Sequence, residues 1–545
     1  PKSGRDSPDG SPAGGEEVAA PVVAAPTDPV AAAIAEGVGR RRTRGALGSV
    51  NEPGSRNARL AFEAEMVGNW DRAAQLLQNR LALEALRRDP AEWVSYAKFC
   101  CRSRGRQAAA EEALRQAVKL LADPSVQHTS EIAMEVDLML ACLLMDRGRA
   151  EEAIKVFRAW HEKDLADPLL NFLLGLGLFL AGEDAASQHL EAAGKPRSWF
   201  KGLRDFAAVA ENLKGDAGGM TSAYVACVEK LLDFGLSSLA FSFLDQCEIL
   251  SPQETASEPV RLLDAKAAAL ERDFQAALKA LEPLLGAGSA SQETWRLAGE
   301  CHFQLQDFDK ALQAVQQALG FEAKLEDSVG AAVYIRYGAC LVAKKRWKAA
   351  CDAFLKSIQL RPTAEAWSGV AYAEYKADNT DMAYEALCEA ALLDNQRPDV
   401  WAQLSLVHLR QENWDSADHC LRQTLAHGPD CDELLLEAAV EYNRKERSPE
   451  FSEAAARCSL RIRDCGMAHA ALADALERQG EKEQSVLEAE IALKQLTNQP
   501  DQRKAVFDKA LKLCEELEDP ALLESLQAAK KLADEQQEKR PGSPA

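Results

Sequence analysis

Between Trp401 and Pro429 the sequence concentrates side chains that bind metals or transfer protons in enzymes. The segment reads WAQLSLVHLRQENWDSADHCLRQTLAHGP. Its candidate groups are His408, Asp415, Asp418, His419, Cys420 and His427. A zinc site requires such imidazole, thiolate and carboxylate ligands to converge, either at i, i+4 spacing on one helix or from several chain segments. Whether they converge depends on the elements that carry them.

A repeat of 34 residues indicates what those elements are. Trp401 follows Trp367 by 34 residues, and Ala417 follows Ala383 by the same interval. This period, with alternating large and small residues, resembles the tetratricopeptide repeat, in which two helices are joined by a turn. The repeat is clearest from Tyr334 to Pro362, in YIRYGACLVAKKRWKAACDAFLKSIQLRP. Small residues at two positions of each repeat let its helices approach closely, and a proline ends the second helix.

The repeat register separates the candidate ligands. His408 falls in the first helix of its repeat, whereas His419 and Cys420 fall in the second, at positions set by packing. We therefore interpret the cluster as a consequence of repeat packing. No phosphate-binding loop, nucleophile elbow, HExxH or EF-hand pattern occurs in the sequence. We predict no catalytic residue, no cofactor-binding residue and no metal site.

Composition narrows the class of protein further. The chain has 545 residues, of which 47% are hydrophobic and 27% charged, as expected of an ordered protein. Its net charge of −21 argues against nucleic-acid binding. The 14 cysteines are scattered without a CxxC pattern, which favours reduced thiols inside the cell. The longest apolar run, 169–182, is too short to cross a bilayer. Because the chain starts at Pro1 rather than Met, we expect it to be a fragment.

The predicted fold is all-α, a right-handed superhelix of about a dozen tetratricopeptide-type repeats. We divide the chain as follows: 1–55, a disordered leader rich in Pro, Gly and Ala; 56–193, a first repeat set; 194–219, an irregular helical joint; 220–500, a second repeat set; 501–536, capping helices; and 537–545, a loose tail. The leader contains an arginine cluster that either contacts an acidic surface or is simply solvated. Its members are Arg40, Arg41, Arg42 and Arg44.

Stacked first helices of such repeats line a groove that binds other proteins. No repeat here carries the Lys and Asn pair with which chaperone-binding repeats hold a terminal carboxylate. The groove instead contains two apolar patches, which either bind a partner or pack against the next repeat. One patch comprises Phe172, Leu176 and Phe179, and the other comprises Ile335, Tyr372 and Tyr375.

A more specific resemblance begins at Leu60. The segments LAFEAEMVGNWDRAAQLLQNRLALEA and, from Trp93, WVSYAKFCCRSRGRQAAAEEALRQAV resemble the start of the C-terminal repeat region of the cilia- and flagella-associated protein 70 family. The resemblance implies an axonemal protein of the central apparatus of motile cilia, with β-rich domains ahead of the repeats. It implies binding to other central-apparatus proteins. The alternatives are a cytoplasmic adaptor or assembly factor unrelated to cilia, and the regulatory part of an enzyme whose catalytic domain lies outside this chain.

Overall fold

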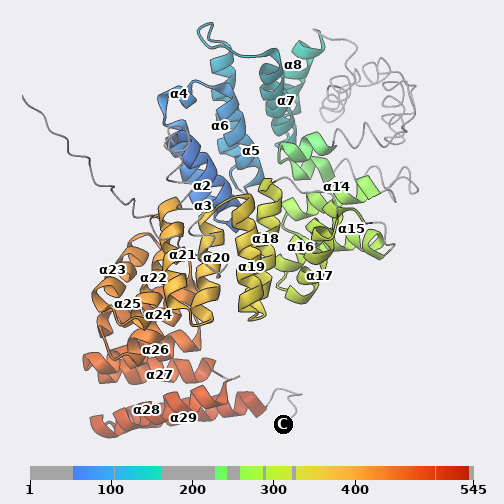
Figure 1. Cartoon of the computed structure of the whole chain (residues 1–545). Coiled ribbons are helices and arrows are strands. Elements are labelled where there is room, and N and C mark those ends of the chain that lie inside the picture. The colour runs from blue at the N-terminus through green and yellow to red at the C-terminus, as the bar shows by residue number, and fades with distance from the viewer. Residues whose placement is uncertain are drawn as a thin grey trace, which may run out of the picture. The chain divides into compact units, whose positions relative to one another are not determined.

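The computed structural model describes residues 53–103, 105–162, 174, 228–241, 258–286, 290–321, 327–496 and 499–538. Throughout these residues the regular elements are helices (Figure 1). The predicted leader lies outside the described residues, apart from 53–55, which are helical. The predicted joint at 194–219 also lies outside them.

The helices of the first part of the chain form a continuous series. They are α2 (Pro53–Val67), α3 (Trp70–Leu81), α4 (Glu84–Arg87), α5 (Pro90–Arg102), α6 (Gln107–Leu121), α7 (Ser130–Asp146) and α8 (Ala150–His161). Further helical residues occur within 228–241. Their apolar side chains share one core that extends to Val260 on the next helix.

The second part of the chain begins with helices α14 (Glu258–Leu270), α15 (Phe274–Gly286), α16 (Gln292–Gln304), α17 (Phe308–Leu319), α18 (Asp327–Ala343) and α19 (Trp347–Leu360). It continues with α20 (Ala364–Lys376), α21 (Thr380–Leu393), α22 (Pro398–Arg410), α23 (Trp414–Ala426), α24 (Asp432–Arg444) and α25 (Pro449–Ile462). The last helices are α26 (Gly466–Gln479), α27 (Lys482–Gln495), α28 (Pro500–Leu517) and α29 (Pro520–Glu538).

The helix starts reproduce the period of the sequence. Helices α20, α22, α24 and α26 begin at Ala364, Pro398, Asp432 and Gly466, so each start lies 34 residues after the one before. Each of these helices packs against the helix that follows it, and α20, α22 and α24 also pack against the next helix of the series. The predicted all-helical repeat fold is therefore confirmed.

Close contact between the two helices of a repeat depends on small residues, as predicted. A Cβ atom added at Gly338 of α18 would lie 2.7 Å from the ring of Phe354 on α19. The same addition at Gly299 of α16 would lie 2.7 Å from Val315 on α17. Both distances are too short for non-bonded carbon atoms, whose optimal separation is about 3.5–4.0 Å. These glycines thus let the paired helices approach.

Each turn between the helices of a repeat requires a left-handed backbone conformation. Asp378, Glu412, Glu446 and Gly480 occupy equivalent turns, and all four have positive φ. In each turn the chain ends the first helix and reverses direction for the second, which is a common role of this conformation at helix ends. Only one of the four is a glycine, so the turns are recognised from sequence by repeat register rather than by residue type.

Candidate functional site

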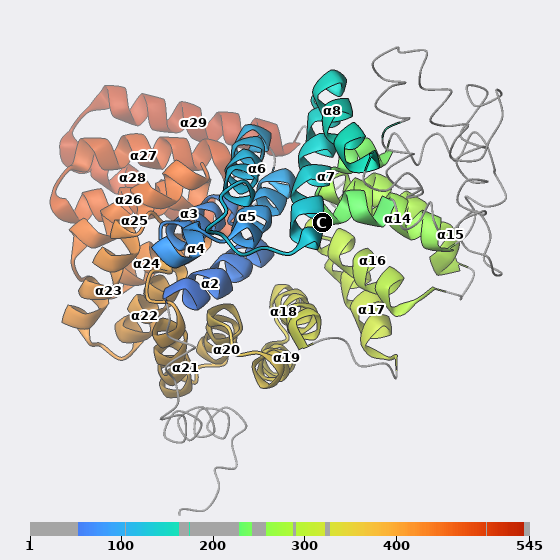
Figure 2. The ribbon, with the colours of Figure 1, turned by 90° about the horizontal axis from the view of Figure 1, so that it is seen from above.

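The first helical pair lies against three turns that join consecutive repeats of the second part of the chain. The turns are residues 361–363 between α19 and α20, 394–397 between α21 and α22, and 427–431 between α23 and α24. We call these three turns, with the helix ends beside them, the inter-repeat edge. Figure 2 shows α2 and α3 next to α20, α22 and α24, and the contacts below connect them.

Arginine side chains make much of the contact between the first pair and the edge. Arg59 on α2 donates a hydrogen bond through Nη2 to the carbonyl oxygen of Leu393, at 3.4 Å. Arg72 on α3 forms an ion pair with the carboxylate of Asp394. Asn69, which caps α3, donates through Nδ2 to Oδ2 of Asp430 at 3.2 Å. The edge therefore offers carboxylate and carbonyl oxygens to the cations of the first pair.

A buried carboxylate of α2 meets the beginning of α20. Oε2 of Glu63 accepts a hydrogen bond from the backbone N–H of Ala364, the first residue of α20, at 3.3 Å. The N-terminus of a helix carries unpaired N–H groups and a partial positive charge, which favour an anion. Burial nevertheless raises the pKa of Glu63 above its ordinary value of 4.5, because it removes water from the charged form. Phe62 precedes Glu63 on α2, and the guanidinium of Arg361 from the edge lies 5.0 Å from the centre of its ring.

The edge itself is built around Arg397, whose side chain is 11% exposed. Nε of Arg397 donates to Oδ1 of Asp399 at 3.0 Å, and Nη2 donates to Oδ2 at 2.6 Å. The same guanidinium also pairs with Glu365. These partners hold the pKa of Arg397 well above its ordinary value, despite its burial, and lower the pKa of Asp399. Asp399 and Arg397 are therefore ionised, and with Glu365 and Asp394 the edge carries more acidic than basic side chains.

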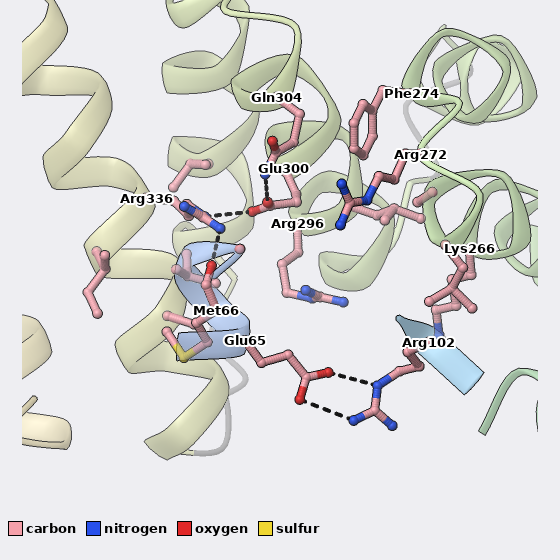
Figure 3. Close-up of a pocket in the computed structure, with 18 of the residues that line it drawn as sticks. Glu65, Met66, Arg102, Lys266, Arg272, Phe274, Arg296, Glu300, Gln304 and Arg336 are labelled. Carbon is pink, nitrogen blue, oxygen red and sulfur yellow. Dashed lines mark hydrogen bonds and ion pairs between the residues drawn. The ribbon is translucent and has the colours of Figure 1, made fainter. Parts of the chain in front are cut away.

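A cavity of ≈ 880 Å³ opens beside this contact, between the first helices and α14, α16 and α18. Figure 3 shows ion pairs projecting into it from both sides. Arg102 pairs with Glu65 at 2.8 Å, and Arg336 pairs with Glu300 at 3.0 Å. Arg336 also donates through Nη2 to the carbonyl oxygen of Met66 at 2.5 Å, which connects α18 to the end of α2.

The remaining charges of the cavity are also compensated. Glu293 is paired with Arg296 at 2.7 Å and with Lys266 at 3.4 Å. The hydrogen bond from Arg296 lowers the pKa of Glu293 to about 2, so this carboxylate is ionised at neutral pH. Arg272 is exposed and lies over the ring of Trp70, 5.4 Å from its centre. Acidic and basic side chains of the cavity lining therefore balance one another, and the cavity has no excess charge that would attract an ionic ligand.

The residues of the second predicted patch lie in two different places. Ile335, which is 5% exposed, lines the cavity next to Arg336. Tyr375 is 3% exposed and lies beneath the guanidinium of Arg410, 3.6 Å from the ring centre. Burial raises the pKa of Tyr375 above the ordinary range, and the Glu437 carboxylate adds to the effect. Partner binding by these side chains stays a prediction.

Tyr372 is more accessible than Tyr375. Its ring packs edge-on against Trp347 at 6.4 Å, and Nζ of Lys376 lies 5.1 Å from the ring centre. Burial raises the pKa of Tyr372 to about 12. Lys376 in turn pairs with Glu437 of α24 at 2.6 Å. Lys376 of α20, Arg410 of α22 and Glu437 of α24 thus form a layer of charged side chains over the two rings. The other predicted patch, Phe172, Leu176 and Phe179, lies outside the described residues.

The histidines that opened the sequence analysis pack as aromatic side chains. His408 contacts Tyr384 at 5.4 Å between ring centres, and His419 contacts Trp401 at 6.3 Å. Burial lowers the pKa of His408, which favours its neutral form. Burial raises the pKa of the Cys420 thiol to about 11, so this thiol is protonated at neutral pH. Across the described residues, no group of three or more His, Cys, Asp or Glu side chains is arranged to hold a metal ion.

Sequence reasoning missed the inter-repeat edge and its contact with the first pair. Arg72 and Asp394 are 322 residues apart. Neither residue occupies a position that the repeat pattern marks, and a long side chain at a surface position carries no signal of its distant partner. The excess of carboxylates near residues 394–399 is visible in the sequence, but charged residues of helical repeats are usually solvated.

Comparison with known proteins identifies the repeats. The family model described as the cilia and flagella-associated protein 70 middle TPR-like domain matches residues 58–191. The model described as the C-terminal domain of the same protein matches residues 247–507. The chain is a tetratricopeptide-repeat protein. Its repeats resemble those of cilia- and flagella-associated protein 70, which confirms the resemblance inferred from the segment beginning at Leu60.

Curated relatives carry the same name. The human cilia- and flagella-associated protein 70 is 25% identical over 163 residues, which are 30% of this chain and 14% of the human protein. The protein of the same name from Macaca fascicularis is 30% identical over 78 residues, or 14% of this chain and 8% of that protein. The matched part of the chain therefore spans about a seventh of the human protein and less of the macaque one.

Solved structures of helical-repeat proteins also align with the chain. The Cut9-Hcn1 hetero-tetramer of APC/C matches with a TM-score of 0.38 and 13% identity, covering 85% of this chain and 97% of that one. Yeast Tom70 matches with a TM-score of 0.36 and 14% identity, covering 88% of this chain and 100% of that one.

Within the described part of the chain, no helix is both long and apolar enough to cross a membrane.

Proposed function

We propose that this chain is a non-enzymatic protein-interaction scaffold of the motile cilium, and that it holds neighbouring projection proteins in the central apparatus of the axoneme. The observation that supports this most strongly is the order of the two family matches. Middle and C-terminal repeat regions of cilia- and flagella-associated protein 70 follow one another along one chain, at 58–191 and 247–507. A protein built on both regions is suited to the same kind of assembly.

The geometry supports a scaffolding role because helical repeats present long rows of equivalent side chains. Ion pairs connect neighbouring repeats, for example Lys445 with Glu412 at 3.1 Å and Lys509 with Asp474 at 3.0 Å. Each exposed pair contributes only about 0–1 kcal/mol. Such a surface offers binding specificity to partner proteins rather than a site for chemistry. The arginines at 40–42 and 44 lie outside the described residues, and their contact with an acidic surface is part of the proposal.

The location of the protein in a ciliated cell tests the proposal. The full-length protein, tagged at its own gene, is imaged with an axonemal marker before and after detergent extraction of the membrane. We expect the tag to remain along the extracted axoneme. A tag that is diffuse in the cell body and lost on extraction would favour the cytoplasmic adaptor or assembly factor instead. Co-purification with a catalytic domain encoded ahead of this chain would favour the regulatory part of an enzyme.

A further inference from the structure

The inter-repeat edge and the first helical pair have complementary charges. Around Arg397 the edge carries the carboxylates of Glu365, Asp394 and Asp399, so negative charge is in excess. The first pair brings two further arginines to the same place, Arg59 and Arg72, together with the carboxylate of Glu63. Without the first pair, Asp394 would lose its arginine partner.

The two sides of the first pair differ in the kind of contact they make. On the side of α5 the pair shares an apolar core: Trp70 packs against Phe99 at 6.0 Å between ring centres, and Ala73 is fully buried. Ion pairs such as Arg102 with Glu65 at 2.8 Å add to this core. On the side of the edge the described residues make hydrogen bonds, ion pairs and one arginine–aromatic contact. Polar interfaces within a chain resemble transient interfaces between proteins. The edge contact is therefore the side of the pair that is able to open.

We propose that the inter-repeat edge is a docking site for an arginine-bearing helix of a partner protein, which α2 and α3 occupy within the chain until the partner replaces them. The partner inserts arginines toward Asp394 and the carbonyl of Leu393. It supplies a side-chain oxygen to the N–H of Ala364 and an aromatic ring beneath Arg361. This docking deepens the proposed scaffold function, on which it rests for its biological setting, but the contact is tested on the purified chain alone.

The structure defines the chemistry that the edge selects. At Ala364 a side-chain oxygen, like that of Glu63, accepts a hydrogen bond from an N–H of the first turn of α20 that has no partner within the helix. An arginine is preferred over a lysine at Asp394, because the guanidinium forms several directed hydrogen bonds to carboxylate and carbonyl oxygens. An acidic helix is rejected, since its carboxylates would face those of Glu365 and Asp399. The first pair is thus the template for the partner.

Charge reversal within the full chain tests whether the contact opens. We expect Arg72→Glu to increase amide hydrogen exchange in residues 53–67 and 364–376, while exchange in α26 and α27 stays unchanged. Adding Asp394→Arg to that variant forms the ion pair again with the two charges exchanged between the residues. Hydrogen exchange should then return to the wild-type rate. Should Arg72→Glu prevent folding, Arg59→Ala replaces it. Arg59 reaches the edge through one hydrogen bond to a backbone carbonyl, and its ion pair with Glu63 at 3.7 Å lies within α2.

A synthetic peptide of residues 53–81 serves as the probe for the partner. The peptide should bind the Arg72→Glu chain, or the Arg59→Ala chain in its place, at least tenfold more tightly than the wild-type chain, whose own first pair occupies the edge. The same peptide carrying Arg72→Glu should bind neither chain. In the charge-swapped chain, Arg72→Glu with Asp394→Arg, affinity for the unmodified peptide should fall back to the wild-type level or below.

Two results would overturn the docking proposal. One is unchanged exchange in residues 53–67 and 364–376 of the opened chain. The other is equal binding of the unmodified and the charge-reversed peptide. Neither result bears on whether the protein lies in the axoneme, so failure of the docking proposal is distinguishable from failure of the proposed function.

Discussion

Arg72 of α3 forms an ion pair with Asp394, which follows the last residue of α21, although 322 residues separate the two in sequence. Only 5% of the Asp394 side chain is exposed. Its Oδ1 also accepts a hydrogen bond from the backbone N–H of Gln396 at 3.1 Å. The pair therefore joins the first helical pair to the turn before α22 and neutralises a nearly buried carboxylate.

Removing the arginine should weaken this junction measurably. Arg72→Ala leaves Asp394 buried without its cation, and we expect the free energy of opening between α3 and the edge to fall by about 1–3 kcal/mol. Native-state hydrogen exchange of the α3 amides measures this free energy of opening. Arg88→Ala is the matched control, because Arg88 and Glu84 form an ion pair with 73% and 86% of their side chains exposed. The control should change stability by less than about 0.5 kcal/mol, and an equal effect of both variants would refute the role of the pair.

The contact should also depend on pH through Glu63. Because burial raises the pKa of Glu63 above 4.5, the closed contact binds a proton more tightly than the open one. The stability that this proton contributes is present in acid and is lost as pH rises through the raised pKa. The charged groups that face Glu63 are Arg59 on its own helix and Arg397 and Asp394 on the edge, and their net attraction for the carboxylate limits the shift.

Glu63→Gln isolates this dependence, since the amide keeps an acceptor for the N–H of Ala364 but has no charge to desolvate. We expect residues 53–67 to exchange faster in the wild-type chain than in the variant at neutral pH. The ratio of the wild-type exchange rate to that of the variant should approach one as the pH is lowered. The pH is kept above the pI of ≈ 5.0. A ratio that is constant over this range, or better protection of the wild-type chain at neutral pH, would show that Glu63 does not control the contact.

The repeat fold was predictable because its rule is local. Period, small residues and helix ends recur within one repeat, as Ala383 and Ala417 illustrate, and each repeat contacts mainly its neighbours. The inter-repeat edge was not predictable, because it depends on long side chains that meet across many repeats. The burial of Tyr375 was missed for a related reason: the pattern places its ring on a first helix but does not reveal that Arg410 covers it.

The small positions give a further prediction about stability. Gly338→Ala places a Cβ against the Phe354 ring, and Ala350→Leu enlarges a fully buried position of the same repeat. Each should destabilise the repeat by about 1–3 kcal/mol through overpacking. Gly286→Ala is the control, since a Cβ there meets nothing within 4 Å. Hydrogen exchange should report the loss in α18, α19 and adjacent helices, whereas a uniform loss along the chain would contradict the local character of the repeats.

Truncating Tyr372 and Tyr375 to Ala separates binding from packing. If the rings anchor a partner, affinity should fall by at least about 2 kcal/mol, the usual scale of an interface hot spot, while helix content is retained. Melting temperature and affinity for a partner protein from an axonemal extract are both measured on the same double variant. Because Tyr375 is 3% exposed beneath Arg410, we expect some loss of stability as well. Lost stability with unchanged affinity would remove both residues from the candidate partner-binding site.

Cryo-electron tomography of cilia tests the central claim most directly. Axonemes from cells that lack the full-length protein are averaged and compared with those from parental cells and from cells in which expression is restored. The scaffold proposal predicts the loss of density from a projection of the central apparatus, together with the neighbours that it holds, and recovery of both on re-expression. An intact central apparatus in the absence of the protein would contradict it.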